Sequence, residues 1–319
     1  MKSGWKLWTL LPMVIAGCFF APLLAQNNYQ VQVMFRVALY AALAMAWNVV
    51  GGYAGQLSLG HVAFFGIGAY GFTLLALHSV PLWVAVFLAA IAATVLAAVI
   101  GVIVFRLRGP YFTLATIAVG EVLRLTARNL DFTGGARGLD TPALFAGRNS
   151  ARLFYFAGVT LGAVAFLVNA WVSRSRFGYY LMAIREDEDT AAAVGIDSAR
   201  TKLQSLLISA FLTGLGGAVY ASAFQYIIPD NVFDIDKSVQ IAIITMLGGA
   251  GTLLGPIVGA VLLISASEIF KNQFQEGHLL IYGVLIVVVV LFLPEGIVGG
   301  LRQLFRRGKK PEVVKAAAR

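Results

Sequence analysis

Long apolar runs separated by short polar segments follow one another along most of the chain. Ten of these apolar runs are close to the length of about 20 residues that a helix needs to cross a membrane. They cover roughly 7–25, 33–50, 60–77, 82–105, 110–127, 153–172, 203–226, 238–248, 256–270 and 279–293. The run at 238–248 is too short to span alone. Because backbone polar groups in lipid must be satisfied within their own segment, the pattern predicts an all-α polytopic membrane protein of about eight to eleven helices, with ten the best estimate.

Composition supports this prediction. Of the 319 residues, 59% are hydrophobic and only 12% are charged, against a charged share of about 25% in soluble domains. No soluble core could bury so much apolar surface. The short alternating runs of a transmembrane β-barrel are not found in the sequence.

Basic residues predict the orientation. With the N-terminus inside, the inner segments at 1–6, 106–108, 174–202 and 302–319 hold 16 of the 24 Lys and Arg residues. Since positive charge accumulates on the cytoplasmic side, both termini are expected to be cytoplasmic. The net charge of +9 then reflects topology and anionic lipid headgroups, not nucleic acid. We expect an N-terminal helix and short outer loop at 1–32, a membrane core at 33–293 with a cytoplasmic loop at about 173–202, and a basic tail at 294–319.

The N-terminus has two interpretations. Lys2 and Lys6, an apolar run and the motif "IAGC" that ends at Cys18 are similar to a bacterial lipoprotein signal. We favour an ordinary first transmembrane helix, because "FFAPLLA" continues the apolar run where a lipoprotein has a polar tether. Cys18 is the one cysteine of the chain, which excludes an internal disulfide and a cysteine-rich metal site.

Enzyme motifs give no support for catalysis. "GIGAYG" at 66–71 has the dinucleotide-binding spacing, but that motif is meaningful only between a strand and a helix, and here it lies inside an apolar run. These glycines more plausibly allow close helix packing. The chain has no phosphate-binding loop, and His61, His78 and His278 lack metal-ligand spacing. We expect no catalytic site, no bound metal and no cofactor on this chain.

Two glycine-rich segments interrupt the apolar runs. The first glycine-rich segment, "NVVGGYAGQLSLGHVAFFGIGAYG" at 48–71, is echoed by the second, "LGGAGTLLGPIVGA" at 247–260. A break in a membrane helix frees backbone groups, which is tolerated only where protein or a water-filled cavity covers them. Two breaks in corresponding places of a possible internal repeat indicate a translocation route. The alternative is that these glycines serve close packing alone.

Few ionisable residues lie within the apolar runs. They are Arg36, Glu121, Arg124, Glu268 and His61. Glu121 and Arg124 are three residues apart on one helix face, so we expect them to neutralise each other, and Glu268 and Lys271 repeat this spacing. A proton-driven carrier would be expected to bury unpaired carboxylates or histidine relays. The scarcity of such groups counts against one, although a sodium-coupled secondary transporter could use backbone carbonyls.

Four motifs carry a resemblance to a known family. "WNVVGGYAGQLSLGHVAFFGIGAY", "YFTLATIAVGEVLR", "TGGARGL" and "AIREDEDTAAAVGIDSARTK" resemble the permeases of branched-chain amino acid ABC importers, in particular the M-type subunit, from about Ala41 to Pro294. The resemblance implies a second related permease, two cytoplasmic ATPases that bind the ATP, and a periplasmic substrate-binding protein. It also implies a location in the bacterial inner membrane. Permeases for urea and short amides look similar, so the substrate stays open between these classes.

The resemblance and the glycine pattern together suggest three groups of site residues. The expected translocation pathway holds a non-helical turn at Gly51, Gly52 and Gly55 with weak solute contacts from Gln56, Ser58 and His61, and continues at Gly248, Gly249 and Gly251. The expected ATPase-coupling loop comprises Arg185, Glu186, Asp187, Glu188, Asp189, Ala191, Ala192, Ala193 and Gly195. Within it "EDEDTAAAVG" at 186–195 predicts a short helix that is ended by Gly195 and has the three alanines as its contact face. The loop expected to face the binding protein contains Thr133, Gly134, Gly135, Arg137 and Gly138. The alternative for the coupling segment is a charged loop exposed to solvent. The alternative for the loop that is expected to face the binding protein is a simple connection between helices.

Overall fold

The computed structural model describes residues 22, 27–107, 109–273, 283 and 296–299. Its long helices are α2 (Asn28–Trp47), α3 (His61–Leu77), α4 (Leu82–Val104), α5 (Pro110–Asn129), α6 (Ser150–Val172), α9 (Ser198–Phe224), α11 (Ile235–Gly248) and α12 (Gly255–Gln273). Each corresponds to one of the expected apolar runs. The expected runs at 7–25 and 279–293 lie almost wholly outside the described residues, so the total number of helices stays a prediction.

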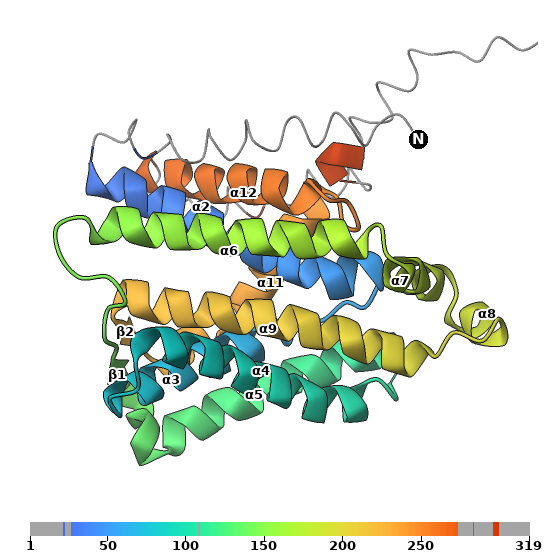
Figure 1. Cartoon of the computed structure of the whole chain (residues 1–319), viewed down its shortest axis with the longest axis horizontal. Helices are drawn as coiled ribbons and strands as arrows, with labels where there is room; N and C mark the ends of the chain where they lie inside the picture. Colours follow the sequence, from blue (N-terminus) through green and yellow to red (C-terminus); the bar gives the residue numbers. More distant parts are fainter. Residues whose placement is uncertain (1–21, 23–26, 108, 274–282, 284–295, 300–319) are drawn as a thin grey trace, which may run out of the picture.

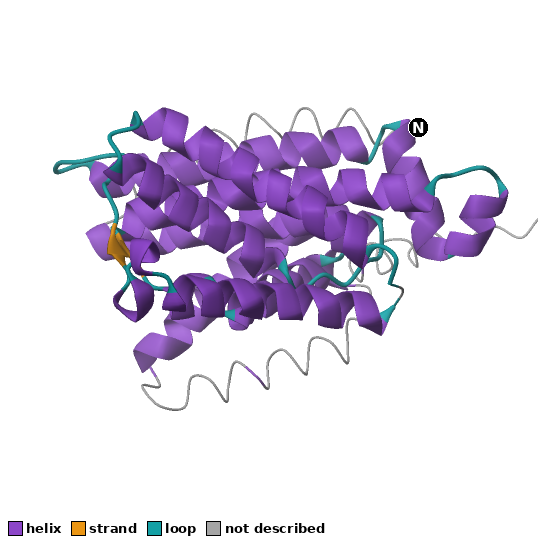
Figure 2. Ribbon diagram, turned by 90° about the horizontal axis from the view of Figure 1, so that it is seen from below, coloured by secondary structure: helices purple, strands orange, loops and turns teal. Residues whose placement is uncertain are grey.

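Short elements lie at the two ends of the helix bundle (Figure 1). One end, here called the strand end, carries the 3₁₀ turns at Asp131–Thr133 and Gly135–Arg137, the antiparallel pair β1 (Leu139–Asp140) and β2 (Tyr226–Ile227), and α10 (Pro229–Val232). The other end, here called the loop end, carries α7 (Arg176–Glu186) and α8 (Glu188–Ala193), which project from the bundle in Figure 1. Apart from the two short strands, the described elements are helical (Figure 2).

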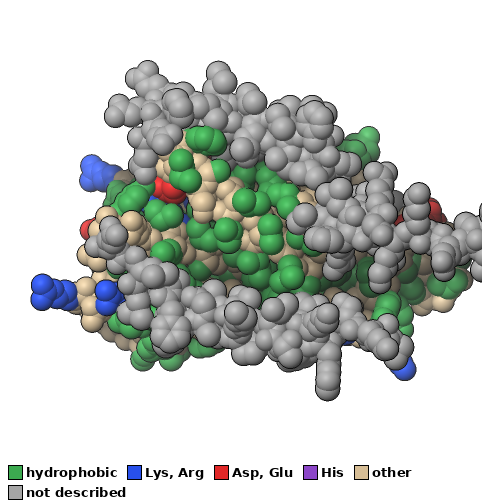
Figure 3. All heavy atoms as spheres, turned by 90° about the horizontal axis from the view of Figure 1, so that it is seen from above, with side chains coloured by type: hydrophobic (Ala, Val, Ile, Leu, Met, Phe, Trp, Pro, Cys, Tyr) green, Lys and Arg blue, Asp and Glu red, His purple; other side chains and the backbone are tan. Residues whose placement is uncertain are grey.

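The outer surface of the bundle is apolar. On α4 the large side chains point outward and the small ones inward: the exposed set is Trp83, Phe87, Ile91, Val95 and Val99, and the buried set is Ala85, Ala89, Ala93 and Ala97. This arrangement inverts that of a soluble protein, because lipid tails solvate large apolar side chains while small residues let helices approach closely. Figure 3 shows hydrophobic side chains over the visible face, with the visible Lys and Arg near its ends.

The arrangement supports a multi-pass membrane protein. Four of the described helical segments are long and apolar enough to cross a membrane: 28–53, 82–104, 150–172 and 198–224. Two shorter apolar helices, at 61–77 and 255–270, accompany them. The prediction of a helical polytopic membrane protein is therefore confirmed.

Helix α9 lies at the centre of the bundle and packs against α2, α3, α4 and α6. The crossing of α3 and α9 is close because glycines meet there. A Cβ atom added to Gly68 would overlap the backbone of Gly214, and one added to Gly217 would overlap the carbonyl oxygen of Phe65. Gly68 belongs to the "GIGAYG" motif, so these contacts support the interpretation of its glycines as packing residues.

Candidate functional site

The first glycine-rich segment begins with a wide helical turn. Asn48–Tyr53 form a π-helix that continues α2, so Gly51 and Gly52 do not lie in the non-helical turn that we expected. Their missing side chains leave room for larger neighbours: a Cβ atom at Gly51 would overlap the Trp47 ring, and one at Gly52 would overlap the Asn48 amide. Such π-turns occur often at functional sites.

The non-helical part of this segment starts only after the π-turn. Gly55 has a φ of +68°, a left-handed conformation that glycine adopts without strain, and the chain then runs irregularly until α3 begins at His61. The indole Nε1 of Trp47 donates a hydrogen bond to the carbonyl oxygen of Ser58 at 2.7 Å. The irregular stretch is thereby folded back against the helix that precedes it.

Ser58 and His61 are fully buried and bonded within the protein, and so do not face a solute pathway in this conformation. The hydroxyl of Ser209 in α9 donates to the carbonyl oxygen of Ala46, which leaves it to accept from Nε2 of His61 at 2.7 Å. Nδ1 of His61 then accepts from the hydroxyl of Ser58 at 3.1 Å. The three side chains join α3 to α9. Gln56 alone of the three expected solute contacts is partly exposed.

The second glycine-rich segment contains a true break between α11 and α12, at residues 249–254. Gly249 and Gly251 have φ values of +122° and +77°, whereas Gly248 is the last residue of α11. The hydroxyl of Thr252 donates to the carbonyl oxygen of Gly249 and accepts from the backbone N–H of Gly255. These bonds satisfy part of the backbone that the break exposes.

The buried amide of Asn48 connects the two glycine-rich segments. Its Oδ1 accepts from the backbone N–H of Gly251 at 2.8 Å, and its Nδ2 donates to the carbonyl oxygen of Thr252 at 3.1 Å. Nδ2 also donates to Oδ1 of Asn169 in α6 at 3.0 Å. The sequence analysis overlooked both asparagines. Both could have been found, because a side-chain amide within an apolar run needs a hydrogen-bond partner inside the bundle.

Arg185, near the C-terminus of α7, reaches both glycine-rich segments. Its Nη1 donates to the carbonyl oxygen of Gly52 at 2.7 Å. A Cβ atom added to Gly55 would lie 2.8 Å from Cγ of Arg185, and one added to Gly251 would lie 2.7 Å from its Nη1. The side chain of Arg185 therefore connects the expected coupling loop to both segments of the expected pathway. Arg185 contacts the bundle in this way although the residue as a whole is exposed.

The short helix expected after Arg185 is present as α8. Asp187 is its N-cap, and its carboxylate accepts from the backbone N–H of Thr190 at 2.5 Å. That hydrogen bond lowers the pKa of Asp187. Glu188 and Asp189 occupy the first turn, where the helix dipole favours acidic groups, and Gly195 follows the helix with a φ of +90°.

The three alanines of α8 do not form one contact face. Ala191 is buried against the chain's own helices, whereas Ala192 and Ala193 are exposed. Lys202 at the start of α9 is almost fully buried, and its ammonium bonds Glu188 at 2.7 Å. It also lies 5.7 Å from the centroid of the Phe105 ring. The pair connects α8 to α9, and the Lys202 ammonium lies beside the C-cap residue of α4.

The loop at the strand end is rich in turns, as its glycines and proline predicted. Gly134, Gly135 and Gly138 all have positive φ values, and the buried Thr133 donates its hydroxyl hydrogen to the carbonyl oxygens of Ala127 and Leu130. The Arg137 side chain is exposed, while its carbonyl oxygen accepts from the hydroxyl of Tyr226.

The ionisable residues of the spans are paired. Glu121 and Arg124 bond each other as expected, at 2.6 Å, and Arg124 also pairs with Asp230 of α10. Glu268 pairs with Arg36 of α2, and its expected contact with Lys271 falls on a side chain outside those that the structure describes. Helices α2 and α12 are in contact, which brings together two residues far apart in the sequence.

Comparisons with known proteins agree with this picture. The profile of a family described as "Branched-chain amino acid transport system / permease component" matches residues 29–290. The high-affinity branched-chain amino acid transport system permease protein LivM of Escherichia coli (strain K12) is 29% identical over 93% of this chain and 75% of its own length. The permease protein LivH of the same system in Salmonella typhimurium is 25% identical over 82% of this chain and 91% of its own length.

Among solved structures, PsaBC from Streptococcus pneumoniae in complex with Fab aligns with a TM-score of 0.47 and 14% identity, over 90% of this chain and 99% of that chain. The family assignment comes from the sequence profile, which extends from α2 past α12 and includes both glycine-rich segments and the α7–α8 loop. The chain belongs to the family of branched-chain amino acid transport system permease components.

Proposed function

We propose that this chain is a permease subunit of an ATP-driven importer for branched-chain, aliphatic amino acids in the bacterial inner membrane. The observation that carries the proposal is the meeting of α7 and both glycine-rich segments at Arg185. A loop that touches both interruptions of the membrane helices is placed to open and close a pathway when the loop is moved from outside the membrane. The names of LivM and LivH support the choice of substrate.

The partners follow from what this chain lacks. A transport cycle driven by ATP needs subunits that bind ATP, and the sequence contains no phosphate-binding loop. We therefore assign ATP to two cytoplasmic ATPases that contact α8, and solute delivery to a periplasmic binding protein that contacts the loop at 131–140. A second related permease completes the pathway. In this proposal 1–32 is an N-terminal transmembrane helix with a short outer loop, 33–293 is the permease core and 294–319 is a cytoplasmic tail.

Transport by the complete complex tests the function. The chain, its second permease, the two ATPases and the binding protein are reconstituted into liposomes, and uptake of radiolabelled leucine is compared with uptake of urea. We expect leucine uptake that requires both ATP and the binding protein. Uptake of urea but not of leucine would favour the amide class of permease. Leucine uptake by this chain alone under a sodium or proton gradient would show a secondary transporter.

The orientation has its own test. The proposal places the loop end in the cytoplasm and the strand end in the periplasm, in agreement with the positive-inside rule. Ala136 is exposed in the loop at the strand end. A cysteine at Ala136, in a background without Cys18, is expected to react with an impermeant thiol reagent in intact spheroplasts. Labelling that appears only after the membrane is opened would contradict this orientation.

A further inference from the structure

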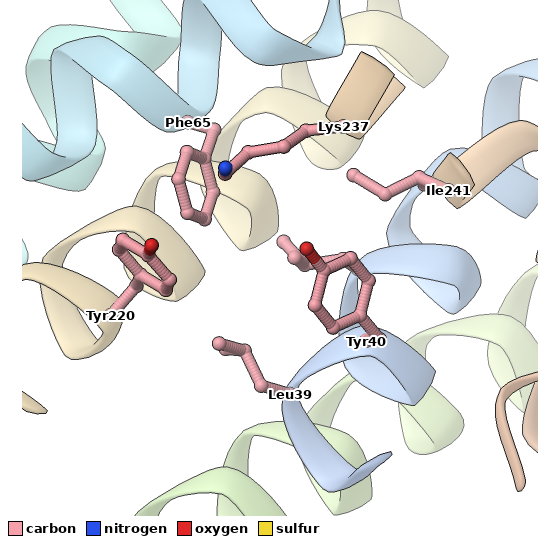
Figure 4. Close-up of a pocket in the computed structure, with 7 residues that line it drawn as sticks. Leu39, Tyr40, Phe65, Tyr220, Lys237 and Ile241 are labelled. Carbon is pink, nitrogen blue, oxygen red and sulfur yellow. The ribbon is translucent and has the colours of Figure 1, made fainter. Parts of the chain in front are cut away.

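A narrow crevice lies between α2, α3, α9 and α11. Its side chains leave almost no space that a water molecule could occupy. Its lining consists of Leu39, Tyr40, Leu43, Phe65, Tyr220, Lys237 and Ile241. The side chains converge on this space from four helices, and the ammonium end of Lys237 lies beside the Phe65 ring (Figure 4). The space is a thin slot, so a ligand can enter only when the lining side chains move apart.

Lys237 gives this slot a positive charge that is not neutralised by a direct ion pair among the described residues. Its Nζ donates to Oδ1 of Asn231 at 2.6 Å and lies 5.7 Å from the centroid of the Tyr220 ring. Among the described residues, no carboxylate lies within ion-pair distance of Lys237. Asp234 and Asp236 are near enough to act on it electrostatically, but Asp234 caps α11 by accepting from the backbone N–H of Asp236.

Three other cations of the described helices have carboxylate partners. Lys202 bonds Glu188, Arg36 bonds Glu268, and Arg124 bonds Glu121. A cation among apolar and aromatic side chains is costly unless an anion accompanies it. A half-buried lysine that has neutral partners is therefore suited to accept an anion from outside the chain.

The walls of the slot limit what that anion can be. Leu39, Leu43 and Ile241 form an aliphatic surface, and Phe65 closes one side. A solute with a carboxylate at one end and a branched aliphatic group at the other matches both the charge and the walls. Urea and short neutral amides have no negative charge, and urea has no aliphatic group, so Lys237 offers neither of them an ion pair.

We propose that Lys237 holds the carboxylate of an aliphatic amino acid as it passes from the strand end into the bundle, with the side chain of the amino acid against Leu39, Leu43 and Ile241. This inference rests on the proposed function and extends it by naming where the solute is recognised. The contact is transient, because a pathway that binds tightly delays release. Affinity for the free solute then belongs to the binding protein, and Lys237 affects the maximal rate.

The test compares Lys237→Met with Lys237→Arg in the complete reconstituted complex, with saturating leucine-loaded binding protein. Loss of a hydrogen bond to a charged group typically changes an equilibrium roughly tenfold or more. We expect Lys237→Met to lower the maximal rate of leucine uptake at least about tenfold. Lys237→Arg keeps the charge and should stay within about threefold of the parent. Basal ATP hydrolysis should be unchanged in both.

Arg148→Gln is the matched control, because Arg148 is an exposed cation of a connecting loop and its replacement should leave uptake unchanged. Equal loss of uptake in both Lys237 variants would show a structural role and overturn the inference. The inference would also be overturned if the complex with Lys237→Met imported leucine at the parental rate. If the parent complex imports no branched-chain amino acid at all, the proposed function itself is wrong, which is a distinguishable result.

Discussion

At the scale of single residues, one buried amide decides whether the two glycine-rich segments stay together. Asn48 is fully buried and bonds Gly251, Thr252 and Asn169. Each of these groups would be left without its partner inside the membrane if the amide were removed. A buried polar group without a hydrogen bond costs about 1–3 kcal/mol, which makes Asn48 more important to the site than its sequence context suggests.

We predict that Asn48→Leu lowers the stability of the purified complex by about 2–3 kcal/mol and reduces uptake. Thermal unfolding followed by tryptophan fluorescence measures the first effect. Asn129→Leu is the control, because the Asn129 amide is exposed and bonds only the carbonyl oxygen of Leu125 within its own helix. If the complex with Asn48→Leu unfolds at the same temperature as the complex with Asn129→Leu, the Asn48 amide does not hold the two glycine-rich segments together.

Residue pairs also show what sequence alone could not predict. The spacing of Glu121 and Arg124 on one helix face predicted their ion pair correctly. The same reasoning could not predict that Glu268 also pairs with Arg36, which is 232 residues away in the sequence. A local pattern indicates local partners only. Which helices lie side by side depends on packing, and so do the contacts of Asn48 and Arg185.

At the scale of elements, α8 is a short helix with one face on the bundle and one face free. Ala191 and Glu188 attach it to the bundle, while Ala192, Ala193 and Val194 are exposed. Its existence and its C-terminal end could be predicted from the sequence, because acidic residues favour a helix start and glycine commonly follows a helix end. Its start was predicted at Glu186, but Glu186 is the last residue of α7 and α8 begins at Glu188. Its buried face could not be predicted, since that requires knowledge of where α4 and α9 lie.

We predict that Ala192→Trp leaves the permease folded but abolishes the stimulation of ATP hydrolysis by loaded binding protein. The exposed side chain gives tryptophan room in the permease, but adds bulk where the ATPase is expected to contact α8. Ala199→Trp, at another exposed position of the loop end, serves as the control. If Ala192→Trp still couples hydrolysis to uptake as the parent does, α8 is not the contact that drives transport.

The cap of α8 predicts a pH dependence. The pKa of Asp187 is lowered by its hydrogen bonds to Thr190, so the cap is present above the ordinary aspartate pKa of about 3.9 and is lost as pH falls through the lowered value. Stimulated ATP hydrolysis at pH 5.5–8 should therefore show no titration of Asp187. Asp187→Asn, which retains a capping oxygen, should match the parent there, and Asp187→Ala should be weaker throughout. If stimulated ATP hydrolysis fell between pH 6 and 8 in the parent but not in Asp187→Asn, Asp187 would titrate in that range, which would contradict a lowered pKa.

At the scale of the whole molecule, the sequence analysis predicted the helices well and the site only in part. Every expected run within the described residues forms a helix, because apolar length is set by the thickness of the membrane. The glycine-rich segments were located correctly, but Gly51 and Gly52 lie in a π-turn, and Ser58 and His61 are packing residues. A glycine in the sequence can mark either an irregular backbone or a close approach of neighbouring groups. The sequence alone does not distinguish these two roles.

The fold suggests how force travels through the molecule. Glu188 and Lys202 connect α8 to α9. Arg185 of α7 bonds the carbonyl oxygen of Gly52 and lies close to Gly251. One side chain therefore touches both interruptions of the membrane helices, and we propose that a contact on α8 is transmitted along these connections. The central claim is that this connection converts movement of the cytoplasmic loop into opening of the pathway.

The most direct test measures leucine uptake and ATP hydrolysis together in proteoliposomes that contain the complete complex with Arg185→Met. Arg176→Met, at the exposed first residue of α7, is the control and should keep the parental ratio of leucine imported to ATP hydrolysed. Loss of a hydrogen bond from a charged donor is worth roughly a tenfold effect or more. We predict that Arg185→Met still hydrolyses ATP while that ratio falls at least about tenfold. An unchanged ratio in Arg185→Met would contradict the claim that Arg185 connects the loop to the pathway.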